Sequence, residues 1–153
     1  MHIEFGAVDH LDQQDRPHAD TFDDRLKLIE AYDAAGFYAY HLTEHHFTPL
    51  GLSPSPNVFL AAASRVTNRL RLATLVYVMT AYHPLRLAEE ICMVDQLSHG
   101  RLEIGTGRGI SPFEIGYFGI DHLESRAIYR EAWAIVESQT AKTIPSPAHE
   151  GAQ

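Results

Sequence analysis

Four short strand-like runs alternate with four longer helical patterns along this chain, and this order constrains the fold more than any other feature. Runs that alternate in this way form βα units, and successive βα units build a parallel sheet covered by helices. The third run, from Leu72 to Val78, is almost entirely apolar. Such a run is typical of a parallel strand that is buried on both faces. The sequence therefore predicts an α/β protein with a parallel sheet.

Helix start and stop signals place the boundaries of the four units. We predict strands at residues 2–8, 37–41, 70–78 and 101–105, and helices at about 21–35, 56–67, 84–98 and 121–137. Thr21 and Ser55 can serve as N-caps, and Gly36 can end the first helix. Asp121 and Glu124 fit a capping box at the start of the last helix. Between the fourth strand and that helix we predict a long loop that contains glycines.

The four units fill residues 1–137, which is about half of a (β/α)8 TIM barrel. Closing such a barrel takes eight units and about 250 residues, whereas the chain has 153. Residues 138–153 contain prolines and a glycine without a helical period, so we predict an irregular tail and a truncation point there. An open sheet of four parallel strands would expose two edges and its barrel-facing side. The pattern alone leaves a doubly wound four-stranded domain as the alternative.

Composition limits the classes of partner. The chain has 12 basic and 20 acidic residues and a formal net charge of -8, which argues against binding to nucleic acid or to an anionic membrane. Its longest apolar stretch, residues 73–82, is too short to span a bilayer. Cys92 is the only cysteine, which excludes an intramolecular disulfide and suits a reducing compartment. Because no signal-peptide pattern follows Met1, we expect a cytoplasmic protein.

A reactive or ligand-binding side chain follows each predicted strand. In chain order these are His10, the Glu44-His45-His46 cluster, His83 and Arg108. Because the carboxyl ends of parallel strands meet at one edge of a sheet, we expect these groups to converge there. Imidazole can give or take a proton near neutral pH. His45 is flanked by Glu44 and His46, but the H-E-x-x-H spacing is missing, so we predict no metal site.

The glycine-rich stretch at residues 105–109 indicates a phosphate site. Its spacing differs from the G-x-G-x-x-G dinucleotide fingerprint, and Ser111 with Pro112 interrupts the helix that the fingerprint requires. Arg108 in this stretch and Arg126 on the following helix better suit a two-arginine clamp on one phosphate group. Taken by itself, Arg126 would be interpreted as part of a solvated helix face.

The motifs together identify a family. They are Ala35-Gly36-Phe37, Glu44-His45-His46-Phe47-Thr48, His83-Pro84, Asp95-Gln96-Leu97-Ser98 with Gly100-Arg101, Gly105, Arg108-Gly109, Phe118-Gly119 with Asp121, and Ser125-Arg126-Ala127. With this combination the chain resembles the bacterial luciferase-like family of flavin-dependent monooxygenases over residues 1–137. The resemblance implies the N-terminal half of a TIM barrel.

The resemblance also implies a function. Members of this family bind reduced FMN and use molecular oxygen to oxidise a small organic substrate. By resemblance, His45 is the active-site acid/base group, and Arg108 with Arg126 holds the FMN phosphate. The family's non-prolyl cis peptide beside the isoalloxazine maps to Leu75 and Val76.

Further residues and partners follow from the same resemblance. Gly107 stands beside the cofactor where the luciferases carry a reactive cysteine, so we expect no light emission. The full-length protein is expected to be a homodimer in which His46 meets Glu89 of the partner subunit. A flavin reductase is expected to supply the reduced FMN.

Two other functions stay open within this fold. One is a deazaflavin-dependent oxidoreductase without oxygen chemistry. The other is a non-catalytic half-barrel that binds flavin or a protein partner. Because half of the barrel is missing, we do not expect the 153-residue chain alone to form a working site.

Overall fold

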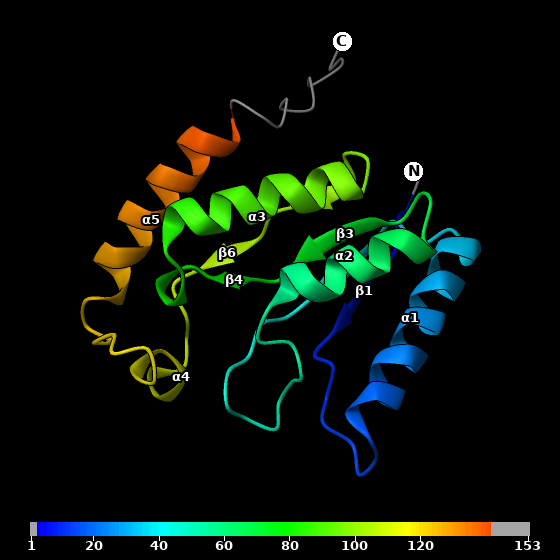
Figure 1. Ribbon diagram of the computed structural model, residues 1–153, viewed down its shortest axis with the longest axis horizontal. Coiled ribbons are helices and arrows are strands. Elements are labelled where there is room, and N and C mark those ends of the chain that lie inside the picture. The colour runs from blue at the N-terminus through cyan, green and yellow to red at the C-terminus, as the bar shows by residue number, and fades with distance from the viewer. Residues whose placement is uncertain (1–2, 142–153) are drawn as a thin grey trace.

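The computed structural model describes residues 3–141 and contains a parallel sheet with helices on one side (Figure 1). The sheet has the strand order β1-β2-β3-β5, formed by β1 (Gly6–Asp9), β2 (Ala39–Leu42), β3 (Arg71–Thr74) and β5 (Leu102–Glu103). A second, two-stranded sheet pairs β4 (Tyr77–Val78) with β6 (Thr106–Gly107). The helices are α1 (His18–Ala35), α2 (Pro56–Val66), α3 (Pro84–Leu97), α4 (Pro112–Gly116) and α5 (Ser125–Thr140), with a short 3₁₀ helix η1 (Met79–Ala81). None of the helices in residues 3–141 is long and apolar enough to cross a membrane.

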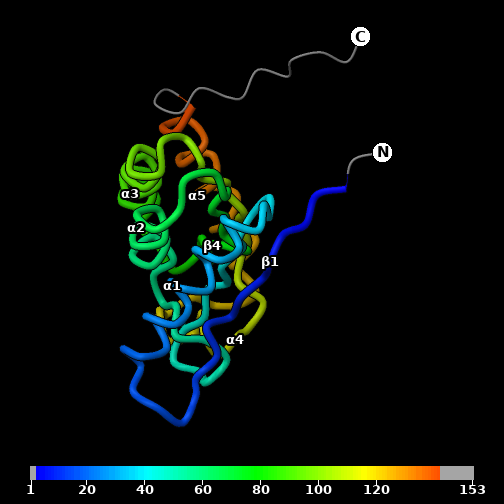
Figure 2. The backbone as a smooth tube through the Cα atoms, turned by 90° about the vertical axis from the view of Figure 1, so that its right-hand side faces the viewer, coloured from blue at the N-terminus to red at the C-terminus, as the bar shows by residue number. Residues whose placement is uncertain are grey.

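One face of the main sheet forms the hydrophobic core. Tyr40, Leu42 and Leu72 are fully buried, and the parallel register pairs Tyr40 with Leu72. Figure 2 shows α1, α2 and α3 on one side of the strands, where they cover this face. Burial of each leucine side chain contributes about 1.5 to 3 kcal/mol to folding.

The opposite face of the sheet is open at its β1 edge within the described part of the chain, whereas Ala73 on the same face is buried. Val8, which points away from the helices, is 57% exposed, and the register aligns it with His41 and Ala73. In a closed barrel this face would be buried inside, because the strands of the second half would complete the wall. The structure is therefore a partial TIM barrel made of four βα units, as the sequence predicts.

The third strand differs from the expected unbroken run at 70–78. It divides into β3 and β4 at Leu75 and Val76, whose peptide bond is cis, as the family resemblance implies. The predicted fourth strand at 101–105 is shortened to β5. Strand β6 lies in the segment predicted as a loop, and it pairs with β4 rather than extending the main sheet. The Leu75 N–H still donates to Leu42 O at 2.8 Å, so Leu75 and Val76 lie at the carboxyl end of β3.

Helix boundaries agree with the sequence where proline or glycine marks them. Helices α2 and α3 begin at Pro56 and Pro84 as predicted, and Gly36 ends α1 with a φ of 79°. Ser55 occupies the N-cap position of α2, but its side chain accepts no capping hydrogen bond. The φ of Gly36 lies in the left-handed region, which glycine adopts readily, and this explains why glycine is a reliable signal for the end of a helix.

Two predicted helix starts are wrong. Helix α1 begins at His18, three residues before Thr21, and the Thr21 hydroxyl accepts a hydrogen bond from Arg16 Nε at 3.1 Å. Helix α5 begins at Ser125 and ends at Thr140 instead of running over 121–137. Asp121 does not form a capping box, because its carboxylate accepts the N–H of Leu123 at 2.9 Å in a turn before the helix.

The end of α1 is fixed to the start of β3 by one carboxylate. Asp33 accepts the backbone N–H groups of Asn68, Arg69 and Leu70 at 2.9, 2.9 and 2.6 Å. Burial raises the pKa of Asp33. The three N–H donors and the Arg69 guanidinium together lower it by more, so the pKa lies below its usual value. A carboxylate with a lowered pKa stabilises the folded chain at pH values above the carboxyl's unfolded pKa.

Replacement of Asp33 by alanine is expected to lower the free energy of unfolding by about 2 to 4 kcal/mol near neutral pH, because three backbone donors lose a charged acceptor. The difference should shrink as the pH falls below about 3.9 towards the folded pKa, because the wild-type carboxylate then becomes protonated. Urea unfolding of both proteins across this range measures it. Asp23→Ala, an exposed change on the same helix, is the control. Equal stability of wild type and Asp33→Ala near pH 7 would contradict the assignment.

Candidate functional site

A cavity of about 410 Å³ opens at the carboxyl ends of the strands. Its apolar wall comes from the β3–β4 break and the loop after β6, and consists of Leu75, Val76, Val78 and Ile110. Its polar wall comes from the ends of β1 and β2 and from α4, and includes His10, Thr43, His45 and Glu114. Three of the four residues predicted to converge, namely His10, His45 and Arg108, line this cavity. The fourth, His83, is exposed at the N-cap of α3 and is not among the lining residues.

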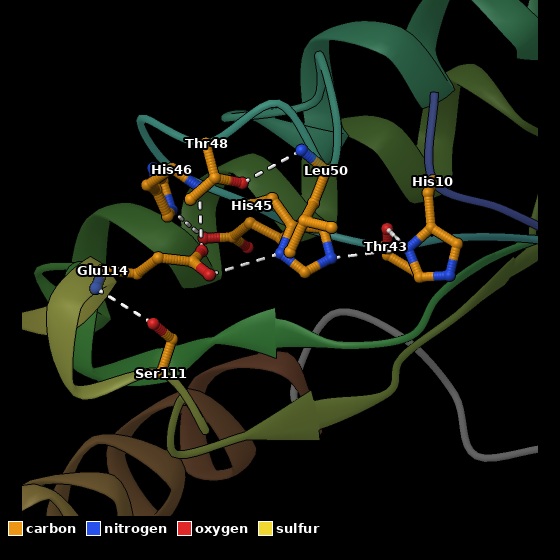
Figure 3. Close-up of polar contacts among 9 residues, drawn as sticks. His10, Thr43, His45, His46, Thr48, Leu50, Ser111 and Glu114 are labelled. Atoms are coloured by element: carbon orange, nitrogen blue, oxygen red, sulfur yellow. Dashed lines mark hydrogen bonds and ion pairs between the residues drawn. The ribbon is translucent and has the colours of Figure 1, made fainter. Parts of the chain in front are cut away.

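His45 is the best-placed proton-transfer group of the cavity. Its side chain is 19% exposed, its Nδ1 lies 3.4 Å from Glu114 Oε1, and its Nε2 lies 3.4 Å from His10 Nδ1 (Figure 3). A carboxylate can only accept a hydrogen bond, so this geometry places the ring hydrogen of neutral His45 on Nδ1 and the lone pair on Nε2. The imidazole can therefore take a proton at Nε2 and hold it.

Glu114 is a site residue that the sequence analysis missed. Its buried carboxylate lies beside His45 and also accepts the backbone N–H of His46 at 2.9 Å. It reaches them because α4 begins at Pro112, and Ser111 Oγ accepts the N–H of Glu114 at 3.3 Å. Serine followed three residues later by glutamate, with proline at the first helical position, is a helix-start signal. The predicted loop was wrong here because Ser111-Pro112 was interpreted as an interruption.

Glu44 supports the histidine loop from inside the protein. Its fully buried side chain accepts hydrogen bonds from His46 Nε2 at 2.7 Å, the Val78 N–H at 3.1 Å and the Tyr82 hydroxyl at 2.9 Å. Burial and the nearby Glu44 charge raise the pKa of Tyr82 far above its usual value, so the phenol stays a donor. The three bonds join the loop after β2 to β4 and η1, which fixes the backbone on either side of the cavity.

The apolar wall requires glycine at position 107. A Cβ added to Gly107 would lie 2.5 Å from Cγ2 of Val76, which is too close for any real side chain. Leu75 is 46% exposed, and both Leu75 and Val76 line the cavity beside Gly107. The structure thus brings these three residues, all predicted to contact a cofactor, to one wall.

The two arginines predicted to form a clamp differ in position. Arg108 lines the cavity, and its Nη1 lies 3.0 Å from Ser125 Oγ and 3.4 Å from His122 Nε2. Arg126 is exposed on the first turn of α5 and is not among the lining residues. Successive helical residues point about 100° apart, so with Ser125 facing Arg108 the Arg126 side chain is directed elsewhere. The structure therefore places Arg108 in the cavity lining, and a clamp formed by Arg108 and Arg126 stays a prediction.

The two residues assigned to a dimer interface lie in different environments. His46 is buried, and besides its bond to Glu44 its ring packs edge-on against Phe118 at a centroid distance of 4.8 Å. Glu89 is exposed on α3, with Arg86 Nη1 at 3.7 Å. Contact between them across two subunits stays a prediction. Within residues 3–141, His, Cys, Asp and Glu side chains form no group of three or more that could hold a metal ion.

Comparison with known proteins places these features in a family. A family model described as luciferase-like monooxygenase matches residues 3–151. The protein y4wF of Sinorhizobium fredii is 53% identical over 134 residues, which cover 88% of this chain and 39% of that protein. The alkanal monooxygenase alpha chain of Aliivibrio fischeri is 40% identical over 114 residues, which cover 72% of this chain and 32% of that protein.

A solved structure shows the same arrangement of elements. It is the oxygenating constituent of 3,6-diketocamphane monooxygenase from Pseudomonas putida in complex with FMN, with a TM-score of 0.84 and 27% sequence identity. The match covers 90% of this chain and 39% of that one. The chain thus spans about two fifths of the length of these matched proteins or less.

Proposed function

The chain belongs to the luciferase-like monooxygenase family, and from this premise we propose that it forms the N-terminal half of a TIM barrel that binds reduced FMN and oxygenates a small organic substrate. One observation carries the proposal. An apolar wall at Leu75 and Val76, a cation at Arg108 and a proton-transfer group at His45 all line one cavity at the carboxyl ends of the strands.

The residues of the cavity fit FMN chemically. The isoalloxazine is a planar, largely apolar ring system, which suits the wall of Leu75 and Val76 with Gly107 leaving room beside it. The phosphate is an anion, which suits the guanidinium of Arg108. Bound reduced FMN would supply the electrons with which molecular oxygen is activated.

The chain's own residues would then control protons and water. His45 would accept or return a proton at Nε2 during oxidation of the substrate, with Glu114 keeping its other ring nitrogen protonated. The apolar side chains of Leu75, Val76 and Ile110 would exclude water from the reacting atoms. Arg108 would hold the cofactor in place.

The proposal extends to partners. A flavin reductase would deliver reduced FMN, and the full-length protein would be a cytoplasmic homodimer with His46 and Glu89 near its interface. The exposed position of Glu89 on α3 supports this interface, because its carboxylate is accessible to a second subunit. The substrate would be a small organic molecule that fits against the apolar wall.

The test uses a complete barrel, in which this chain replaces the matching segment of the 53%-identical Sinorhizobium fredii protein. Arg108→Ala should weaken FMN binding by about 1.5 to 3 kcal/mol, roughly 10- to 150-fold, because a charge-assisted bond to the phosphate is lost. Flavin fluorescence titration measures the dissociation constant. Arg126→Ala tests the clamp, and Arg130→Ala, an exposed change on α5, is the control.

Three outcomes separate the proposals. An unchanged FMN dissociation constant in Arg108→Ala would contradict its phosphate role. A deazaflavin absorbance spectrum of the purified chimera would show that the cofactor is deazaflavin and not FMN. Tight, stoichiometric FMN binding by a monomer of the 153-residue chain would contradict the expectation that this chain alone forms no working site.

A further inference from the structure

A second imidazole meets His45 at the cavity. His10, just after β1, places its Nδ1 3.4 Å from His45 Nε2 and 3.0 Å from Thr43 Oγ1. The two rings lie nearly parallel, with an interplanar angle of 28° and centroids 5.5 Å apart. In Figure 3 His10, His45 and Glu114 form a row from β1 to α4. The register of β1 against β2 brings these residues together. Asp9 and Leu42 form the last pair of the two strands, so His10 and Thr43, which follow them, lie at the same end of the sheet.

Exposure increases along this row. Glu114 is buried, the His45 side chain is 19% exposed, and His10 is exposed. His10 is therefore the more exposed of the two imidazoles and offers a proton on His45 a route to solvent. The other nitrogen of His45 faces Glu114, which has no further titratable contact towards the surface among the described hydrogen bonds.

The hydrogen bonds permit a proton on either side of the His45–His10 contact. When His10 carries hydrogen on Nδ1, that hydrogen faces the lone pair of His45 Nε2. When His45 carries hydrogen on Nε2, it faces the lone pair of His10 Nδ1. The Thr43 hydroxyl accepts from His10 Nδ1 in the first state and donates to it in the second, because a hydroxyl can do both. In each state His10 Nδ1 shares its one hydrogen, or its one lone pair, between Thr43 Oγ1 and His45 Nε2.

We propose that His10 is the proton relay of His45. A proton that His45 has accepted at Nε2 passes to His10 Nδ1, so one N–H bond breaks and another forms, and the His10 ring then releases its Nε2 proton to water. The reverse order recharges His45. The inference rests on the function proposed above for His45, but it concerns only groups of this chain. A residue that merely held the His45 ring in place would need the hydrogen bond and not the titrating ring.

The experiment measures how fast the proton on His45 Nε2 exchanges with water. The readout is NMR of the full 153-residue chain, labelled with ¹⁵N-histidine and free of flavin. His10→Asn keeps an amide near the position of Nδ1 but cannot relay a proton, whereas His10→Phe removes the polar contact. Exchange is expected to slow at least about tenfold in both variants. His83→Asn, an exposed histidine outside the cavity lining, is the matched control and should exchange like wild type.

Two results would overturn the relay. Unchanged exchange in both His10 variants would show that His45 reaches water by another route. Slow exchange in His10→Phe together with wild-type exchange in His10→Asn would show that His10 only positions the ring. Because the readout needs no cofactor, loss of the relay and failure of FMN binding are separate results. A retained amide spectrum confirms that each variant is folded, which the exposed position of His10 leads us to expect.

Discussion

Replacement of His45 by alanine is expected to lower turnover in the complete chimeric barrel by about 10²- to 10⁴-fold, the usual contribution of a positioned acid/base group. FMN affinity and the fold should be largely kept, because the imidazole is only partly buried and is not part of the apolar wall. Oxygen consumption coupled to substrate oxidation measures turnover, and flavin fluorescence measures affinity. His83→Ala, at an exposed histidine outside the cavity lining, is the control.

The comparison with His46→Ala sharpens this result. His46 donates to the buried Glu44 rather than facing the cavity, so its replacement should act on dimerisation and stability more than on the chemical step. Equal loss of turnover in both variants with an intact dimer would reverse the assignment. Wild-type turnover in His45→Ala would remove His45 from the mechanism and leave its contact with Glu114 a structural feature.

Replacement of Glu44 by alanine is expected to have the largest effect on stability, about 3 to 5 kcal/mol. The side chain is fully buried, and its removal would leave the donors of His46, Val78 and Tyr82 without an acceptor. Such groups are costly because water cannot replace the missing partner. Urea unfolding followed by circular dichroism measures the difference in the 153-residue chain.

Two further variants separate the causes of that loss. Glu44→Gln keeps the shape and one acceptor oxygen, so it should lose less stability than Glu44→Ala. Glu30→Ala, on the exposed face of α1, should change stability by no more than about 0.5 kcal/mol. A loss in Glu44→Ala as small as that in Glu30→Ala would show that the three hydrogen bonds do not hold the loop.

The sequence alone determined the order of the βα units and several of their boundaries. Pro56, Pro84 and Gly36 mark helix ends correctly because each restricts or permits a particular backbone angle, whatever surrounds it. The family motifs further predicted the partial barrel and the cis bond between Leu75 and Val76. These features depend on local chemistry or on a pattern shared with relatives.

Only the tertiary structure decided which side chains meet. Glu114 lies 69 residues after His45 in the chain, and their contact depends on how α4 packs against the loop after β2. The inward direction of Glu44 and the contact of Arg108 with Ser125 likewise follow from strand register and helix phase. Spacing predicts which groups gather at the strand ends, but packing between distant segments fixes which side chains contact each other.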